Sequence, residues 1–394
     1  MLLANTYATD TRVRREARTL VSEGYDVRIL CWDRQGQHGS REVTDKCHVR
    51  NVRFGKTTIL PTSRLHFVIA ALIFQLTIFL WVVMQIGEAG SVVLHAHDFN
   101  TLPGCAATKR LFKQQTRLIY DSHELTPGAY AEWYGGAISA IVTRIELAAL
   151  RQVDGIVAAN SAILAHLCSA SQVPATTIYN CVPKGDVPNI SRTRAKEKLG
   201  LKNYFVIYFP GKARQDYDLD LMFHAARFLR ENKGFSVKFV FTGHQETMVP
   251  LVKTVGAEHL EDFFDFRGWV TDQELLLYYT ATDLCFAVTS DIGLNTKILT
   301  PIRLFESMAC GVPVVVRDGT LAARIVRQWG CGLIVDNQPT SFSRELVELS
   351  RNREKSRALG EAGHRAFTDE FNWNLMQNRL LQLYSQLSFP IPKS

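Results

Sequence analysis

Apolar positions fall into two series of short strands separated by helical stretches. The first series includes the runs DVRILC, SVVLHA and RLIYD, and the second includes YFVIYFPG, SVKFVFTG and VPVVVRD. Continuous apolar strands that alternate with amphipathic helices are typical of parallel sheets covered on both faces. The pattern predicts an α/β chain with two doubly wound, Rossmann-like domains that face each other across a cleft.

A stretch rich in proline, glycine and charge, residues 182–203, separates the two series and is typical of an inter-domain linker followed by a short helix ending at Gly200. We therefore expect an N-terminal domain over 1–185 and a C-terminal domain over 186–371. The segment 372–394 is predicted to form a closing helix that packs back toward the N-terminal domain. The opening strand, LLAN, is predicted to be unusually short.

Residues 67–86 form an apolar run, FVIAALIFQLTIFLWVVMQI, interrupted only by Gln75, Thr77 and Gln85. The run is long enough to span hydrocarbon. Spanning would separate the preceding residues from the rest of the same predicted domain, which argues against it. Burial against a sheet and a position in the bilayer interface both stay open, and we expect peripheral membrane contact through 67–86.

Composition and charge restrict the class of partner. The 394 residues are 46% hydrophobic and 21% charged, with a net charge of +7, as in an ordinary globular protein. The densest basic run, RVRR at 12–15, is predicted to be a solvated helix face. The other basic residues are scattered and accompany no nucleic-acid-binding motif, so we expect no nucleic-acid partner.

The eight cysteines include no CxxC pair and lie mostly in apolar runs. They are therefore expected to be reduced core thiols, with no metal site and no disulfide framework. The first ten residues, MLLANTYATD, do not resemble a secretory signal, which predicts a cytoplasmic protein or one at the cytoplasmic face of the membrane.

The segment TPIRLFESMACGVPVVV, residues 300–316, carries the most informative chemistry. A proline at a helix start, together with the N–H groups of the first turn, favours an anion site such as one for a diphosphate. Glu306, further along the helix, could accept hydrogen bonds from ribose hydroxyls. A plain strand–helix unit with a solvent-facing glutamate stays open as the alternative.

Histidines and carboxylates gather at predicted strand ends in the first half. His95 and His97 flank Ala96, so the alternation of a strand points both rings to one face. They are either part of a site or core histidines bonded to the backbone. The ends of parallel strands line the ligand crevice of such sheets. The acceptor-side candidates are His95, Asp98, Asp121, His123 and Glu124.

These segments together resemble family 4 glycosyltransferases, which have the GT-B fold. DTRVRREARTLVSEGYDVRILC, LHAHDFNTLPG, LIYDSHEL, FTG at 241–243, FRGWV at 266–270 and the 300–316 segment are similar to the family's motifs and occur in its order. The resemblance covers nearly the whole chain. It implies a retaining, metal-independent transferase of the hexosyl type. Such an enzyme uses a UDP- or GDP-type sugar as co-substrate, needs no cofactor, and acts on a glycan or lipid-linked acceptor.

The resemblance also implies roles for particular residues. His97 matches a histidine beside the transferred sugar, where its imidazole could donate a hydrogen bond, and Lys212 and Arg214 match cations beside the donor phosphates. These three are the catalytic candidates. The donor-binding candidates are Gly211, Gly243, Gly268, Arg303, Leu304 and Glu306; for Arg303, a surface position without a partner stays open.

Two features depart from the family pattern, one at a single position and one at a pair of neighbouring positions. Ile298 stands where the family often has a second glutamate, and Tyr217 and Asp218 stand where it has lysine and glycine. The alternatives to a transferase are therefore a catalytically inactive GT-B partner subunit and another GT-B enzyme such as a nucleotide-sugar epimerase.

Overall fold

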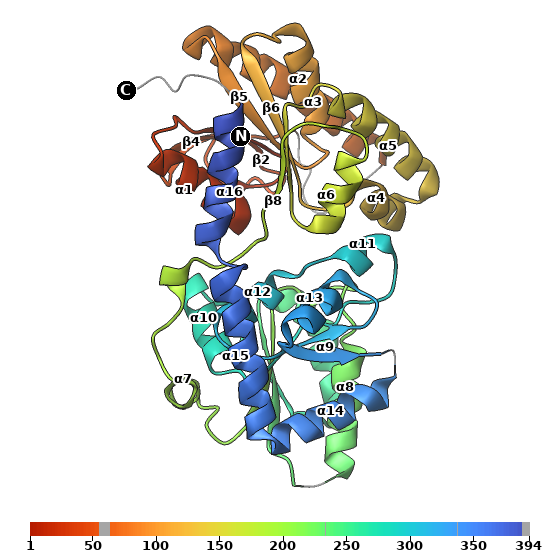
Figure 1. The fold of residues 1–394 in the computed structure, drawn as a ribbon. Helices are drawn as coiled ribbons and strands as arrows, with labels where there is room; N and C mark the ends of the chain where they lie inside the picture. Colours follow the sequence, from red (N-terminus) through yellow and green to blue (C-terminus); the bar gives the residue numbers. More distant parts are fainter. Residues whose placement is uncertain (55–63, 233, 337, 388–394) are drawn as a thin grey trace. The chain divides into compact units, whose positions relative to one another are not determined.

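The computed structural model describes residues 1–54, 64–232, 234–336 and 338–387, and it divides into two compact units (Figure 1). Unit 1 comprises residues 1–179 and 376–394, and unit 2 comprises residues 180–375. Each unit has its own sheet, parallel apart from one edge pair in unit 1, with helices on both faces, so both are Rossmann-like, as the alternating pattern predicted. The last seven residues of the predicted closing segment, 388–394, lie outside the described residues.

The sheet of unit 1 has eight strands among the described residues, in the order β3-β4-β2-β1-β5-β6-β7-β8. All neighbours are parallel except β3 and β4. The first strand, β1, contains only two residues, in agreement with the short opening strand expected from the sequence. The strands are β1 (Leu2–Leu3), β2 (Arg28–Trp32), β3 (Arg41–Thr44), β4 (Cys47–Val52), β5 (Val92–His97), β6 (Thr116–Ser122), β7 (Gly155–Ala158) and β8 (Ala175–Thr177).

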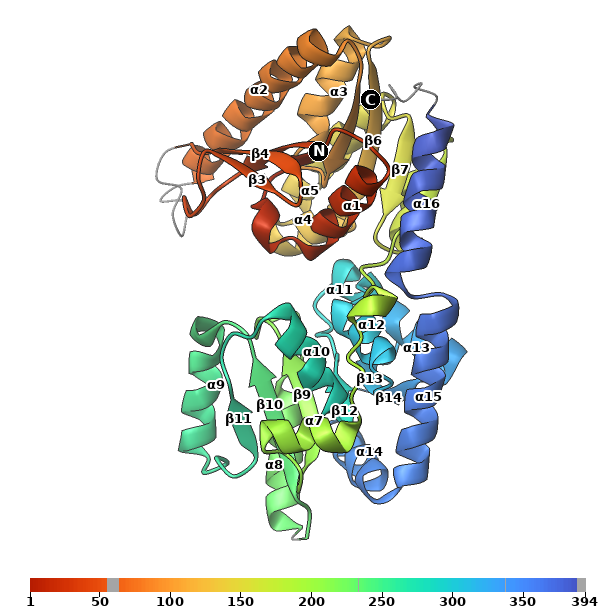
Figure 2. The same ribbon diagram turned by 90° about the vertical axis from the view of Figure 1, so that its left-hand side faces the viewer.

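The helices of unit 1 form two layers (Figure 2). Alternation along β6 separates the two faces of the sheet: Asp121 contacts α1, whereas the neighbouring Tyr120 contacts α5. Tyr384 of α16 contacts His95 of β5, which places α16 in the α1 layer. The helices are η1 (Tyr7–Thr9), α1 (Thr11–Ser22), α2 (Arg64–Ala89), α3 (Leu102–Leu111), α4 (Thr126–Tyr134), α5 (Gly136–Leu150) and α6 (Ser161–Cys168); α16 (Trp373–Gln386) begins in unit 2 and continues into unit 1.

The sheet of unit 2 is parallel throughout its described part, in the order β11-β10-β9-β12-β13-β14. Its core is rich in aromatic rings, including Phe209, Phe239 and Phe286, which are fully buried. The strands are β9 (Phe205–Pro210), β10 (Val237–Thr242), β11 (Phe264–Phe266), β12 (Leu284–Phe286), β13 (Val314–Arg317) and β14 (Gly332–Val335).

Local sequence signals fix the ends of several helices in unit 2. The helix predicted to end at Gly200 does so, because Gly200 adopts the left-handed conformation (φ 70°) that glycine tolerates best. Thr271 and Glu274 form a capping box at the start of α10. The helices are η2 (Lys184–Asp186), α7 (Arg192–Leu199), α8 (Asp220–Glu231), α9 (Gln245–Ala257), α10 (Asp272–Thr280), α11 (Leu294–Ile298), α12 (Ile302–Ala309), α13 (Leu321–Trp329), α14 (Pro339–Arg351) and α15 (Arg353–Asp369).

Candidate functional site

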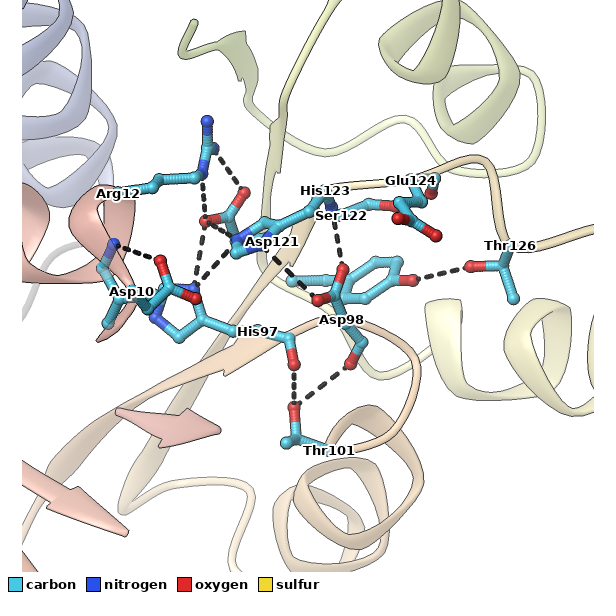
Figure 3. Close-up of polar contacts among 12 residues, drawn as sticks. Asp10, Arg12, His97, Asp98, Thr101, Asp121, Ser122, His123, Glu124 and Thr126 are labelled. Atoms are coloured by element: carbon cyan, nitrogen blue, oxygen red, sulfur yellow. Dashed lines mark hydrogen bonds and ion pairs between the residues drawn. The ribbon is translucent and has the colours of Figure 1, made fainter. Parts of the chain in front are cut away.

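A buried group of charged and imidazole side chains lies at the carboxyl ends of β5 and β6 in unit 1 (Figure 3). We call it the polar cluster; its members are Arg12, Glu16, His95, His97, Asp121 and His123. It forms because the parallel register places His97 opposite Asp121, while α1 lays its first turns over both strand ends. Asp10 caps α1 by accepting a hydrogen bond from the Val13 N–H at 3.1 Å.

Asp121 is the centre of the polar cluster. Its carboxylate accepts two hydrogen bonds from Arg12, at 2.7 and 3.2 Å, and one each from His97 and His123 at 3.1 Å. Burial alone would raise the pKa of Asp121, but the charges of Arg12 and His123 and the histidine hydrogen bonds hold it well below its usual range. Asp121 is therefore a buried carboxylate with a full set of donors.

The contact with Asp121 fixes the tautomer of His97. An ionised carboxylate only accepts hydrogen bonds, so Nδ1 of His97 carries the proton. Burial is the main reason why the pKa of His97 is lowered, which keeps the ring neutral. Nε2 of His97 is then a buried acceptor, and within the described residues it has no hydrogen-bond partner. His97 therefore presents an acceptor, whereas the sequence suggested an imidazole that donates.

His123 differs from the neutral His97, because its pKa favours the protonated, positively charged ring. Although burial lowers its pKa, the carboxylates of Asp98 and Asp121 raise it to about 10. Asp98 lies 3.5 Å from Nδ1 of His123 and also accepts the His123 backbone N–H at 3.0 Å. Asp98 itself has φ 62°, a left-handed conformation that is uncommon for a residue other than glycine. His123 is thus a cation held between two carboxylates.

His95 extends the polar cluster away from the strand ends. Its ring stacks on His97, with centroids 4.4 Å apart, as the strand alternation predicted. Nδ1 of His95 bonds the Tyr384 hydroxyl at 2.9 Å. Glu16 lies 3.7 Å from Nε2 of His95, and its pKa is raised well above the usual range by burial and then by the charge of Asp121. The two histidines therefore bond side chains, which removes the alternative of core histidines bonded to the backbone.

Four members of the polar cluster have the geometry of a metal site. One ligand atom from each of Glu16, His95, His97 and Asp121 falls within 4.8 Å of the others. The guanidinium of Arg12 already lies 3.2 Å from the carboxylate of Glu16 and 2.7 Å from that of Asp121. This positive charge disfavours a divalent cation beside it.

The remaining acceptor-side candidate, Glu124, lies at the edge of the polar cluster. It is partly exposed, and its backbone carbonyl accepts the Ser122 hydroxyl at 2.8 Å. The structure therefore brings together five of the six histidine and carboxylate candidates in unit 1 through direct contacts, and places Glu124 directly after them in the chain.

Three glycine turns of unit 2 stack on one another at the carboxyl ends of β9, β10 and β11. The Gly211 N–H donates to Thr242 at 2.7 Å, and the Gly243 N–H donates to Gly268 at 2.6 Å. Gly243 has φ 136°, and a Cβ there would lie 2.4 Å from the carbonyl oxygen of Gly211. Glycine is therefore required at Gly243 for this close approach.

Arg303, in the first turn of α12, lies beneath the Gly211 turn. Its Nε and Nη2 donate to the Pro210 carbonyl at 3.1 and 2.7 Å, and its guanidinium carbon lies 3.9 Å from the ring centres of both Phe209 and Tyr217. The side chain is 5% exposed, and its Nη1 has no hydrogen-bond partner among the described residues. Arg303 is thus a buried cation, and a surface position is excluded.

Glu306 lies one turn further along α12. The residue is buried, and its carboxylate accepts the Tyr279 hydroxyl at 2.7 Å. The solvent-facing alternative for Glu306 is therefore wrong. Leu304 has a fully buried side chain, and its N–H donates to the Pro301 carbonyl at 2.9 Å. Pro301 takes the N-cap position of α12, one residue before the helix.

The other two candidate cations, Lys212 and Arg214, are exposed on the segment after Gly211. Arg214 pairs with Asp216 at 2.6 Å. The Gly211 turn lies beside the buried Arg303, and Lys212 is the next residue in the chain. Tyr217, which departs from the expected lysine, supplies one of the rings against Arg303.

Four residues of these sites were missed or misread in the sequence. Arg12 was assigned to a solvated face, but it is buried against Asp121. A signal was present: Arg12 and Glu16 fall on the same helical face as the apolar residues of α1, so both are charged groups on a buried stripe. Tyr279 and Tyr384 had no comparable signal, because buried tyrosines at helical spacing are ordinary core residues.

Protein-family models match both halves of the chain. The model described as "Glycosyl transferase 4-like domain" matches residues 8–180, and the model described as "Glycosyl transferases group 1" matches residues 191–366.

Related proteins match over part of their length. A GDP-mannose-dependent alpha-(1-6)-phosphatidylinositol monomannoside mannosyltransferase of Mycobacterium tuberculosis is 29% identical over 139 residues, 34% of this chain and 35% of the relative. Its counterpart from Mycolicibacterium smegmatis is 26% identical over 202 residues, 50% of this chain and 51% of the relative. The chain thus matches about a third to a half of the length of these relatives.

Solved structures share the fold over nearly the whole chain. Sucrose-phosphate synthase from Thermosynechococcus elongatus superposes with a TM-score of 0.77 at 17% identity, covering 98% of each chain. The Anabaena protein HepE in complex with UDP-glucose gives a TM-score of 0.72 at 14% identity, covering 98% of this chain and 99% of that one. The fold is therefore GT-B.

Proposed function

The chain belongs to the glycosyltransferases that join a glycosyl transferase 4-like domain to a group 1 domain, and on this premise we propose a specific reaction. A sugar is moved from a nucleoside diphosphate sugar, of the UDP or GDP type, to a glycan or lipid-linked acceptor, with retention of configuration. The observation that carries the proposal is the buried Arg303, whose Nη1 has no partner among the described residues beside the stacked glycine turns.

Unit 2 offers the chemistry that a nucleoside diphosphate needs. The first turn of α12 and the guanidinium of Arg303 favour an anion, and Lys212 and Arg214 can add contacts from the segment after Gly211. Glu306 would accept hydrogen bonds from the ribose hydroxyls, with Tyr279 holding its carboxylate in place. Among the similar proteins, the mycobacterial relatives are GDP-mannose-dependent, whereas HepE was solved with UDP-glucose, so the base stays open.

Unit 1 offers a hydrogen-bond acceptor to the transferred sugar. Nε2 of His97 is poised to accept a hydrogen bond from a sugar hydroxyl, because Asp121 holds the proton on Nδ1. Asp98 and Glu124, at the same strand ends, would receive hydroxyls of the acceptor. These groups position the substrates, which is a large part of catalysis when two molecules must meet.

In the proposed route, configuration is retained because the acceptor oxygen attacks the face from which the diphosphate departs. The C–O bond to the diphosphate breaks, the new glycosidic C–O bond forms, and the departing phosphate oxygen takes the acceptor proton. Arg303, Lys212 and Arg214 stabilise the negative charge that develops on that phosphate. We propose that these cations make a metal ion and any other cofactor unnecessary.

The proposal is tested by nucleotide binding and product analysis. The purified protein is mixed with UDP- and GDP-sugars, and a rise in the melting temperature of the protein identifies the donor that binds. That donor is then offered together with glycan and lipid-linked acceptors. We expect Glu306→Gln to remove the rise and the exposed Glu354→Gln to keep it. NMR of the product reads the anomeric configuration, and transfer should persist in EDTA.

Each outcome points to a different conclusion. If no nucleotide sugar binds, the chain is better described as an inactive partner subunit, an alternative suggested by Ile298 and Tyr217. Epimerised nucleotide sugar without transfer would favour an epimerase. Inverted product, or activity lost in EDTA and restored by a divalent cation, would refute retention or metal independence respectively.

We place the protein at the cytoplasmic face of a membrane, in contact through 67–86. α2 is long and apolar enough to cross a bilayer, as judged by length and composition of the described residues. One face of it is buried, at Phe74, Ile78 and Val82, while Leu72 and Leu76 on the opposite face are 64% and 58% exposed. A large exposed apolar stripe on a soluble protein marks an interaction surface.

A further inference from the structure

The polar residues inside α2 fasten the helix to its own unit. The side chain of Gln75 accepts the Gly104 N–H and donates to the Asn100 carbonyl, both at 2.8 Å. Gly104 allows this close approach, because a Cβ there would lie 3.0 Å from the Gln75 carbonyl oxygen. A helix that crossed a bilayer would break these contacts and expose the face around Phe74 and Ile78, so α2 lies along α3.

A second set of exposed apolar residues lies on α5, in the same helix layer as α2. α3 packs against both α2 and α5, so the three helices form one layer on the sheet face opposite α1 (Figure 2). α5 exposes Ile138, Ile141 and Ile145 at a spacing of three and four residues, which is one face of a helix. Immediately before α5, Trp133 and Tyr134 are each 48% exposed.

Most of the charged residues exposed on this layer are basic. Arg110, Lys113, Arg144 and Arg151 are exposed on or just after α3 and α5. The acidic residues of α2, α3 and α5 whose side chains are described are otherwise engaged: Glu146 accepts the buried Tyr120 hydroxyl, and Glu88 pairs with Arg28. Apolar residues flanked by cations suit an anionic bilayer, and the same charge would repel a second copy of this surface.

We propose that the outer surface of α2, α3 and α5 rests on an anionic lipid bilayer, with α5 as a second contact beside α2. This inference rests on the membrane contact proposed above for 67–86, and it adds a second line of contact. Two contacts hold unit 1 in one orientation on the bilayer, whereas contact through α2 alone would leave it free to rotate about the axis of that helix. Trp133 and Tyr134 lie at the level of the headgroups, where amphipathic rings are preferred.

The aromatic end of this contact leads back to the polar cluster. α4 begins at Thr126, directly after the segment that carries Asp121 and His123. Tyr130 of α4 donates its hydroxyl to Asn100 at 2.9 Å, and its ring packs against Phe99 on the loop that follows Asp98. The bilayer contact therefore adjoins the strand ends where a lipid-linked acceptor would be bound.

The experiment is flotation of the purified full chain with vesicles of phosphatidylcholine and phosphatidylglycerol. Ile141→Glu should weaken binding by about tenfold or more, because it removes an apolar contact and adds a charge to the interface. The matched control is Val252→Glu in unit 2, since Val252 is also an exposed helical residue, at 47% against 57% for Ile141. Trp133→Ala repeats the test without a change of charge. Leu72→Glu tests the α2 contact by itself.

Circular dichroism and the nucleotide-dependent rise in melting temperature confirm that each variant is folded and that unit 2 is intact. If Ile141→Glu floats like the parent, or no worse than Val252→Glu, the α5 contact is refuted even when Leu72→Glu has lost binding. If the parent protein does not float, both contacts are refuted, while transfer to a soluble acceptor still tests the proposed reaction. A dimer in the absence of lipid that Ile141→Glu converts to a monomer would assign this surface to a second copy and overturn the inference.

Discussion

Asp121→Asn tests how the polar cluster balances its charges. The substitution keeps the shape of the side chain but leaves the buried Arg12 without its bidentate partner, and it turns an amide N–H toward groups that already donate. Breaking a buried ion pair by removing one partner costs about 3–5 kcal/mol. We expect the lower end, about 3 kcal/mol, because Glu16 lies 3.2 Å from Nε of Arg12 and can ionise in its place.

Glu16 is available for this exchange because its pKa is raised by burial and by the charge of Asp121. The raised pKa of Glu16 favours the neutral acid while Asp121 is ionised, so Glu16→Gln, which puts a neutral amide in its place, should cost less than about 1 kcal/mol. In the double variant both carboxylates that pair with Arg12 are gone, and only the weaker influence of Asp10 remains. The loss in this variant should exceed the sum of the single losses by about 2 kcal/mol, as expected for groups that share one partner.

The assay is native-state hydrogen exchange of peptides from β5 and β6, which measures the opening free energy of unit 1 separately from unit 2. Arg344→Gln, on α14 in unit 2, serves as the control and should leave these peptides unchanged. A loss above about 2 kcal/mol for Glu16→Gln alone would show that Glu16 is ionised in the parent protein. Additive losses in the double variant would show that Glu16 does not take over from Asp121. Either result would refute this account of the polar cluster.

Three further predictions concern the two sites. Tyr279→Phe should weaken nucleotide-sugar binding about threefold to tenfold in calorimetry, because Glu306 loses the hydroxyl that orients its carboxylate; unchanged affinity would refute that role. Tyr217→Ala should weaken binding of the nucleoside diphosphate about tenfold but leave the nucleoside unaffected, since Arg303 loses a ring 3.9 Å away; an equal loss for both ligands would contradict it. The pKa of His123 is raised to about 10, so its charge stabilises the folded state fully below about pH 6.5, and this contribution is lost as the pH rises toward 10. Unfolding measured from pH 6 to 10 should therefore show falling stability, and His123→Gln should flatten the slope.

The sequence predicted the sheets better than the side-chain contacts. Strand patterns gave the two parallel series, and the alternation around Ala96 correctly placed His95 and His97 on one face. Arg12 was misassigned because a basic run at helical spacing looks solvated unless its partner is known. That partner, Asp121, is 109 residues away in the chain and meets Arg12 only through the register of β5 and β6.

The 67–86 segment is a second case in which the sequence predicted the element but not its contacts. Its sequence established an apolar helix without a polar face, which local patterning cannot assign to a core, an interface or a bilayer. In the structure the side chain of Gln75 bonds the start of α3, and Phe74 is buried whereas Leu72 is exposed, so one face of α2 packs within its own unit. Contact of the exposed face with a membrane stays a proposal. Such contacts depend on which elements become neighbours.

The sequence by itself determined the class of fold and the family, because strand periodicity, glycine turns and helix starts are local properties that a chain carries in its order. The tertiary structure decided charge and availability: Asp121 holds the proton of His97 on Nδ1, burial and the charge of Asp121 raise the pKa of Glu16, and the guanidinium of Arg303 lies between two rings. These states depend on desolvation and on partners brought from distant segments. A buried group responds to its neighbours in a low-dielectric surrounding, and those neighbours are fixed only when the chain has folded.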